Sequence, residues 1–326
     1  MGPYVRLRAF GWIFAAMQVG ALSDRPDGRK LRPVGASPGR NRLVKGEGGR
    51  PLLVIDGDSF AHRSYHALPK TIRRDRNRPA GAILGFANVL LRLYLDERPR
   101  AVLVAWDTLE AETYRQEALE GYQQGREFDD EIIEQLDVIP EFVSACGFLN
   151  VKAAGYEADD FLAAAARRDA RHGAVLIASG DRDAFQLASP NTTILYPQRG
   201  GVMVRIGPAE VRARYGVEPA QVPDFIALRG DSSDNIPGAP GVGAKGAAAL
   251  LGRYGSLERL LADGRFPAYR EQLRKFRSIA TMDWKAPIPA LRNQKPTWAK
   301  AAALAKRWQL NQLAGRLARL AEDPPS

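Results

Sequence analysis

The chain has 326 residues with 47 Lys and Arg against 37 Asp and Glu, a formal charge of +10. This length fits two domains with sizeable cores, and a hydrophobic fraction of 45% excludes a chain that is disordered throughout. The single cysteine, Cys146, excludes an intramolecular disulfide and a cysteine-based zinc cluster. No apolar run reaches the ~18–20 residues of a membrane span. We therefore expect a soluble protein that contacts no membrane and occupies a reducing, cytoplasmic compartment.

The charge is distributed unevenly along the chain. Residues 1–50 carry ten basic and three acidic side chains, and residues 265–326 carry thirteen and four. The remaining stretch, 51–264, has 24 basic and 30 acidic side chains. An acidic body between basic ends suits a protein that gathers carboxylates around metal ions while other parts meet phosphates. The alternative is an ordinary globular protein with basic tails.

The N-terminal region, 1–50, differs from the rest. A short apolar stretch after two arginines imitates a secretory signal, but a tract rich in Gly, Pro and Arg follows it without periodicity. We expect a basic disordered extension here, and a fold that begins near Pro51.

From that point the pattern alternates between strands and helices. Continuous apolar runs predict buried strands over 52–55, 101–106 and 174–178, and helices are predicted over about 80–96, 130–145 and 158–172. This order predicts an α/β fold with a parallel sheet and helices on both faces. The polar segment 108–130 is predicted to be a solvent-facing excursion. After about 207 short helices follow, and a further helix is predicted near 298–320.

Acidic residues follow each predicted strand. Asp56 follows the first strand, Asp107 the second, and Asp181 with Asp183 the third. The carboxyl ends of parallel strands form the ligand crevice of such sheets. Further acidic residues stand at the start of the helix 158–172 and in the loop near 231: Glu157, Asp159, Asp160, Asp231 and Asp234. So many carboxylates repel one another unless cations neutralise them, and an oxygen-rich set suits Mg²⁺ or Mn²⁺.

A glycine-rich turn is the second candidate functional feature. Gly241, Gly243 and Lys245 precede a predicted helix, so that backbone N–H groups and one cation could meet an anion. The turn is not a Walker A loop, because Gly246 follows the lysine and no strand precedes it. We interpret it as a sequence-independent clamp for a DNA backbone, with a merely structural turn as the alternative.

Together these residues resemble the 5′-nuclease, or flap endonuclease, family, found in the N-terminal domain of bacterial DNA polymerase I and in stand-alone bacterial 5′-3′ exonucleases. The match runs from about Leu52 to about Leu261. The motifs that carry it are Val54–Gly57, Arg63, Tyr65–Ala67, Trp106–Asp107, Thr113–Arg115, Gly155–Asp160, Gly180–Asp183, Gly230–Gly238 and Gly241–Lys245.

The resemblance implies a domain organisation. A PIN-like nuclease core would cover 51–206, with a helical arch at about 108–130 through which a 5′ single strand passes. A helix–three-turn–helix DNA-binding region, often with a bound K⁺, would cover 207–290, and a basic helical segment 291–326. The implied activity is that of a monomeric, metal-dependent 5′-3′ exonuclease and 5′-flap endonuclease. It would act at the nucleoid on flap, nicked or branched DNA in replication and repair.

The resemblance also implies roles for single residues. The first metal ion would be bound by Asp56, Asp107, Glu157 and Asp159, with Asp160 supporting that site or bridging to the second ion. The second ion would be bound by Asp181, Asp183, Asp231 and Asp234. The scissile phosphate or the flap would meet Arg63 and Arg126, and DNA would also contact Tyr122, Gly241, Gly243 and Lys245. The sequence departs from the family at Gln123, where the arch usually carries a lysine.

Other readings of the same residues stay open. Asp56-Gly57-Asp58 resembles the nucleophile motif of haloacid-dehalogenase-type phosphatases, and Asp231 with Asp234 resembles their last acidic motif. That reading leaves Glu157–Asp160, Asp181, Asp183 and the hairpin unexplained. A non-enzymatic, structure-specific DNA-binding protein with a weak site is the second alternative. A PIN-type ribonuclease is a third, although such proteins seldom carry the hairpin. One of Asp159 and Asp160 alternatively caps its helix.

Overall fold

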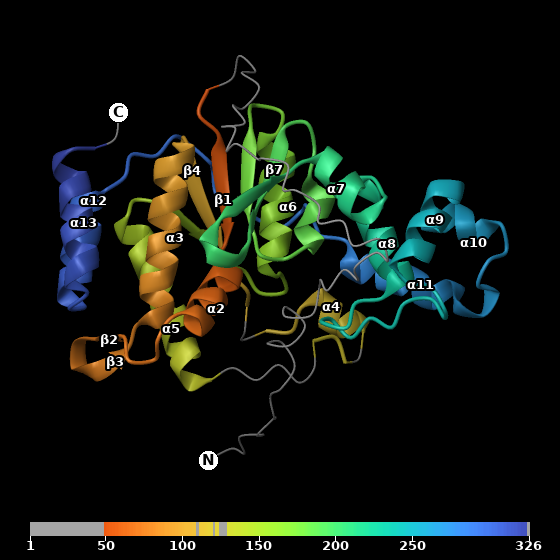
Figure 1. Ribbon diagram of the computed structural model, residues 1–326, viewed down its shortest axis with the longest axis horizontal. Helices are drawn as coiled ribbons and strands as arrows, with labels where there is room; N and C mark the ends of the chain where they lie inside the picture. Colours follow the sequence, from red (N-terminus) through yellow and green to blue (C-terminus); the bar gives the residue numbers. More distant parts are fainter. Residues whose placement is uncertain (1–48, 109–110, 120, 124–128, 325–326) are drawn as a thin grey trace, which may run out of the picture. The chain divides into compact units, whose positions relative to one another are not determined.

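The computed structural model describes residues 49–108, 111–119, 121–123 and 129–324 (Figure 1). The extension expected over 1–50 lies outside the described residues except at its last two positions, and so does Arg126.

A six-stranded sheet forms the centre of the fold. Its strand order is β5 (Leu149–Val151), β4 (Ala101–Ala105), β1 (Leu52–Asp56), β6 (Val175–Ala178), β7 (Thr192–Pro197) and β8 (Met203–Ile206). Neighbouring strands are parallel except β8, which runs antiparallel to β7. Asp56 is in register with Ala105 and Ile55 with Ala178, so β1, β4 and β6 end at the same edge. The predicted α/β fold with a mostly parallel sheet is confirmed.

The sheet separates two apolar cores, because alternate side chains of each buried strand point to opposite faces. On one face, Leu53, Ile55 and their equivalents pack against the helices α2 (Gly57–Ala67), α3 (Gly81–Glu97), α5 (Asp130–Ala145), α12 (Trp298–Arg307) and α13 (Asn311–Glu322). On the other face, Leu52 and Val54 pack against α6 (Ala158–Asp169) and, beyond it, the helices between β8 and α12 (Figure 1).

The helices between β8 and α12 are short. They are α7 (Pro208–Tyr215), α8 (Val222–Arg229), α9 (Ala244–Tyr254), α10 (Leu257–Ala262) and α11 (Arg270–Ala280). The remaining elements are α4 (Tyr114–Ala118), the small hairpin of β2 (Arg73–Arg74) and β3 (Arg78–Pro79), and the 3₁₀ turns η1 (Asp75–Asn77), η2 (Asp183–Leu187), η3 (Arg199–Gly201), η4 (Pro219–Gln221) and η5 (Pro267–Tyr269). No helix among the described ranges is both long and apolar enough to span a membrane.

Two expectations about secondary structure are wrong. The single helix predicted near 298–320 is two helices, because Gln309 takes a left-handed conformation with φ 59° between them. The segment 108–130 is not solvent-facing throughout. In its described part, Thr113, Arg115 and Tyr122 are buried, since each meets polar partners in the interior.

Candidate active site

Asp56 lies at the carboxyl end of β1 and links two other elements. One carboxylate oxygen accepts the backbone N–H of Ser59 at 3.0 Å, which caps α2. The other accepts the hydroxyl of Ser179 at 2.7 Å, and the same hydroxyl oxygen accepts the N–H of Asp181 at 3.0 Å. Burial, together with the charges of Asp107 and Asp181, raises the pKa of Asp56 to about 7. Asp56 and Asp181 are therefore electrostatic neighbours.

Asp107 stands just beyond the end of β4 and faces the start of α6. Its side chain accepts the N–H of Ala158 at 2.7 Å. Its own N–H donates to the carboxylate of Asp58 at 2.7 Å. Burial, followed by the charge of Asp107, raises the pKa of Asp58 well above its usual range. Asp58 is not among the nuclease residues predicted from the sequence, although its position two residues after Asp56 is a signal that could have found it.

Glu157 stands at the N-cap of α6 and meets the residues of the expected arch. Its carboxylate accepts the Thr113 hydroxyl at 3.0 Å and the Tyr122 hydroxyl at 3.3 Å, and it pairs with the Arg115 guanidinium at 3.1 Å. Burial raises the pKa of Glu157 to about 7 against the lowering effect of Arg115. In the first turn of α6, burial and the charge of Asp181 raise the pKa of Asp159 well above its usual range.

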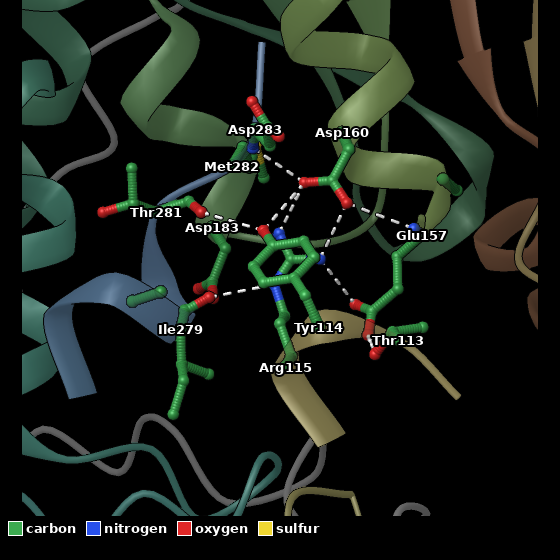
Figure 2. A network of polar contacts seen from close by, with 12 residues as sticks. Thr113, Tyr114, Arg115, Glu157, Asp160, Asp183, Ile279, Thr281, Met282 and Asp283 are labelled. Atoms are coloured by element: carbon green, nitrogen blue, oxygen red, sulfur yellow. Dashed lines mark hydrogen bonds and ion pairs between the residues drawn. The ribbon is translucent and has the colours of Figure 1, made fainter. Parts of the chain in front are cut away.

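Asp160 differs from the other acidic residues because it is fully buried and both its oxygens bond to one guanidinium (Figure 2). The Arg115 guanidinium donates to the two oxygens at 2.7 and 3.0 Å. The N–H of Glu157 donates at 3.1 Å, completing a capping box, and the Tyr114 hydroxyl and the N–H of Asp283 donate at 3.1 and 2.8 Å. The side chain therefore caps α6. Asp160 was expected either to support the first metal site or to bridge to the second ion, and this geometry favours support.

The last two acidic pairs meet beside the end of β6. The N–H of Asp183 donates to the Asp181 carboxylate at 2.9 Å. Burial raises the pKa of Asp183 well above its usual range, and the charges of Asp181, Asp234 and Asp231 add to it. Asp231 pairs with Arg229 at 2.6 Å and accepts the N–H of Ser233 at 2.9 Å. The loop after α8 thus brings its acids to the loop after β6.

The predicted acidic residues raise one another's pKa values and therefore lie in one cluster at the sheet edge. Arg63 lies beside this cluster, where its guanidinium donates to the carbonyl of Gly180 at 2.8 Å. Within the described ranges, no three His, Cys, Asp or Glu side chains converge on one point closely enough to hold an ion alone. Mg²⁺ takes one or two carboxylates and keeps several waters, so a cluster of carboxylates that disfavour one another's charge fits such ions.

The glycine-rich turn lies exposed at the start of α9. The helix begins at Ala244, so Lys245 stands in its first turn, and Gly243 is its N-cap. Gly241 has φ 72°, a conformation that strongly favours glycine. A Cβ atom at Gly241 or Gly243 would meet no other atom within 4 Å. The backbone of this turn is therefore open to a ligand.

Two protein-family profiles together match nearly the whole described chain. The sequence profile of the 5′-3′ exonuclease N-terminal resolvase-like domain matches residues 51–216, and that of the 5′-3′ exonuclease C-terminal SAM fold matches residues 217–323. The chain belongs to the 5′-3′ exonuclease family. Its relatives are hydrolases that cleave nucleic acids, and the expected family is confirmed. The two profiles span the acidic cluster and the glycine-rich turn, which the phosphatase reading leaves unexplained.

Relatives and solved structures agree with this assignment. DNA polymerase I of Mycobacterium bovis is 40% identical over 214 residues, which are 64% of this chain and 24% of the polymerase. The thermostable DNA polymerase I of Thermus aquaticus is 40% identical over 237 residues, 72% of this chain and 28% of the polymerase. This family member therefore spans about a quarter of the length of these relatives.

Among solved structures, the T5 D15 protein co-crystallised with metal ions superposes with a TM-score of 0.60 at 18% identity, covering 83% of this chain and all of that protein. The catalytic core of Rad2 in complex with DNA superposes with a TM-score of 0.52 at 15% identity, covering 82% and 92%. These similarities show a shared fold.

Proposed function

We propose that this family member is a metal-dependent DNA nuclease with 5′-3′ exonuclease and 5′-flap endonuclease activity, acting in replication and repair. The observation that carries the proposal is the single carboxylate cluster assembled from β1, β4, the start of α6, and the loops after β6 and α8. DNA as substrate is supported by the related folds of T5 D15 and Rad2, which have been solved in complex with DNA.

Two divalent cations, Mg²⁺ or Mn²⁺, would neutralise this cluster and stabilise charge on the attacking and leaving oxygens of a phosphodiester. One ion is assigned to Asp56, Asp107, Glu157 and Asp159, and the other to Asp181, Asp183, Asp231 and Asp234, each ion being bound directly by one or two of its carboxylates and through water by the others. The chain holds these ligands in place through its own hydrogen bonds. Ser179 orients Asp56, and the N–H of Ala158 orients Asp107.

Substrate binding is assigned to two regions. Arg63 and Arg126 would contact the scissile phosphate or the 5′ strand. Tyr122 was also expected to contact DNA, but it is buried with its hydroxyl on Glu157, so we assign it no such contact. Gly241, Gly243 and Lys245 would contact the duplex backbone, with K⁺ bound at the turn. The open backbone and exposed lysine of the turn support this second assignment.

The test compares cleavage of 5′-flap, nicked and single-stranded DNA, each with Mg²⁺, with Mn²⁺ and with EDTA. We expect metal-dependent cleavage near the flap junction, and Asp181→Asn serves as the matched control because it removes one carboxylate and leaves the backbone contact with Ser179 possible. Flap binding without cleavage by the wild type under any of these conditions would favour the non-enzymatic alternative. An acid-stable aspartyl phosphate at Asp56 would instead favour a phosphatase.

A further inference from the structure

The end of α11 and the residues after it are bonded to the acidic site at every position. We name residues 279–283 the connector. The carbonyls of Ile279, Ala280 and Thr281 each accept a side-chain hydrogen bond, and the N–H groups of Met282 and Asp283 each donate one. The partners are Arg115 (2.9 Å), Gln186 (3.0 Å), Tyr114 (3.3 Å), Gln186 (3.1 Å) and Asp160 (2.8 Å), in that order.

Arg115 joins the connector to the start of α6 (Figure 2). While its Nε donates to Ile279, its terminal nitrogens donate to both oxygens of Asp160 and pair with Glu157. The side chain is 3% exposed and that of Asp160 is fully buried. A planar guanidinium that is bonded on all sides and excluded from water has one orientation. A shift of the connector therefore shifts Glu157.

Gln186 joins the connector to the other half of the acidic cluster. Its side-chain nitrogen donates to the carbonyl of Ala280 and also to that of Asp183, both at 3.0 Å. Its oxygen accepts the N–H of Met282. One amide thus fixes the connector against the 3₁₀ turn η2, in which Asp183 is the first residue.

The connector is also continuous with the glycine-rich turn. α11 buries Leu273, Phe276 and Ile279 in the core that α8 and α9 share, and Arg277 pairs with Asp224 of α8 at 2.7 Å. The carbonyl of Leu228 in α8 accepts the N–H of Ala239, which opens the turn, at 2.8 Å. Packed helices and hydrogen bonds of this kind move together.

We propose that the connector couples duplex binding at the glycine-rich turn to the placement of the catalytic carboxylates, with Arg115 and Gln186 as its positioning residues. The inference rests on the proposed function. Neither residue touches the reacting phosphate in this scheme, and both act by holding Glu157 and Asp183 in place.

The test uses Gln186→Glu, which keeps the acceptor for Met282 and removes both donated bonds. Two DNA substrates share one 5′ single strand, and only one of them continues into a long duplex. We expect the single-turnover rate on the duplex substrate to fall by about tenfold or more, because small displacements of reacting groups have effects of this size. DNA affinity in EDTA should change less than about twofold, and the rate advantage of the duplex substrate should disappear.

Gln294→Glu is the matched control. The Gln294 side chain accepts the N–H of Val102 on β4 at 2.8 Å and donates to the Val102 carbonyl at 3.1 Å. Replacing this Gln by Glu therefore also removes a donated hydrogen bond, but outside the connector. We expect it to lower the melting temperature comparably and to leave both rates at the wild-type level. Arg115→Lys, which keeps the charge and loses the two-pronged contact with Asp160, provides a second variant and should also abolish the duplex advantage.

The outcomes separate the two proposals. Equal losses on both substrates in Gln186→Glu and Arg115→Lys, with the duplex advantage intact, would show that the connector is only structural. A wild-type protein that cleaves neither substrate would overturn the proposed function instead.

Discussion

Gln123 donates a hydrogen bond from its side-chain amide to the carboxylate of Asp234 across 3.3 Å. The same nitrogen donates to the Tyr122 hydroxyl at 2.9 Å, and the backbone of Gln123 is left-handed with φ 53°. Asn235 donates to the carbonyl of Gly121 at 2.8 Å. The described end of the arch region is therefore attached to the loop after α8, at the position where the family usually carries a lysine.

A lysine at this position would place its ammonium beside Asp234 and would pair with it. We expect Gln123→Lys to change the single-turnover rate by less than about threefold, because Asp234 would neutralise the new charge before a phosphate could benefit from it. Quenched-flow cleavage of a 5′-flap measures the rate. An increase of about a hundredfold would show that the arch lacks a catalytic cation.

Arg126 is the candidate for the cation of the arch that stabilises the charge of the reacting phosphate. We expect Arg126→Ala to lower the single-turnover rate by ~10²–10³, as loss of a preorganised charge donor does. Quenched-flow cleavage with Gln123→Ala as comparison tests the assignment. Similar rates for Arg126→Ala and the wild type would refute it.

The acidic cluster makes the metal-free protein less stable at high pH. Asp56 and Glu157 have pKa values near 7, above their ordinary values of 3.8 and 4.5, so between about pH 4 and 7 the folded state binds more protons than the unfolded state. Stability must then fall as the pH rises through this window. We expect Asp181→Asn, which removes a charge that raises the pKa of Asp56, to melt about 2–4 °C above the wild type near pH 8 and at a similar temperature near pH 5.

Calorimetry in EDTA measures these melting temperatures. Adding Mg²⁺ should stabilise the wild type most near pH 8, because ions that bind only the folded state shift its stability and need ionised ligands. A variant less stable than the wild type at every pH would contradict the inferred repulsion.

Substitution of Lys245 tests the role of the glycine-rich turn in DNA binding. We expect Lys245→Ala to weaken duplex binding and to reduce the slope of log affinity against log salt by about one, as loss of one phosphate contact does. Fluorescence anisotropy over a salt series measures the slope. An unchanged slope would mean that this exposed lysine meets no phosphate.

Gly243 tests whether the backbone of the turn approaches a ligand. Its φ of −90° suits any residue, and an added Cβ meets nothing in the protein. We therefore expect Gly243→Ala to fold normally and to bind duplex DNA at least about threefold more weakly, because the methyl group keeps a phosphate from the N–H groups. Binding equal to that of the wild type would show that no phosphate contacts this part of the turn.

Gly315 provides the matched control for that exchange. It lies within α13, where a Cβ also meets nothing. Gly315→Ala should stabilise the fold by about 0.5–1 kcal/mol through helix propensity and leave DNA affinity unchanged. Thermal melting and anisotropy on both glycine variants make the comparison.

The acidic edge of the sheet could be predicted from local patterns in the sequence. Buried parallel strands are continuous apolar runs whose carboxyl ends share one edge, so Asp56 and Asp107 could be placed there before any coordinates. Strands β5, β7 and β8 escaped prediction because polar residues interrupt their apolar runs, and their pairing depends on a neighbouring strand that already exists.

The residues that surround this edge come together through contacts that form only in the folded protein. Arg115 and Asp160 lie 45 positions apart, and Asp160 and Asp283 lie 123 apart, so no local pattern reveals their bonds. A polar segment is predicted to be solvent-exposed when only its own sequence is considered. Its burial becomes possible when another element of the fold supplies a partner of opposite charge. Hydrophobic periodicity is a local property of the chain, whereas the pairing of buried charges is a property of the assembled interior.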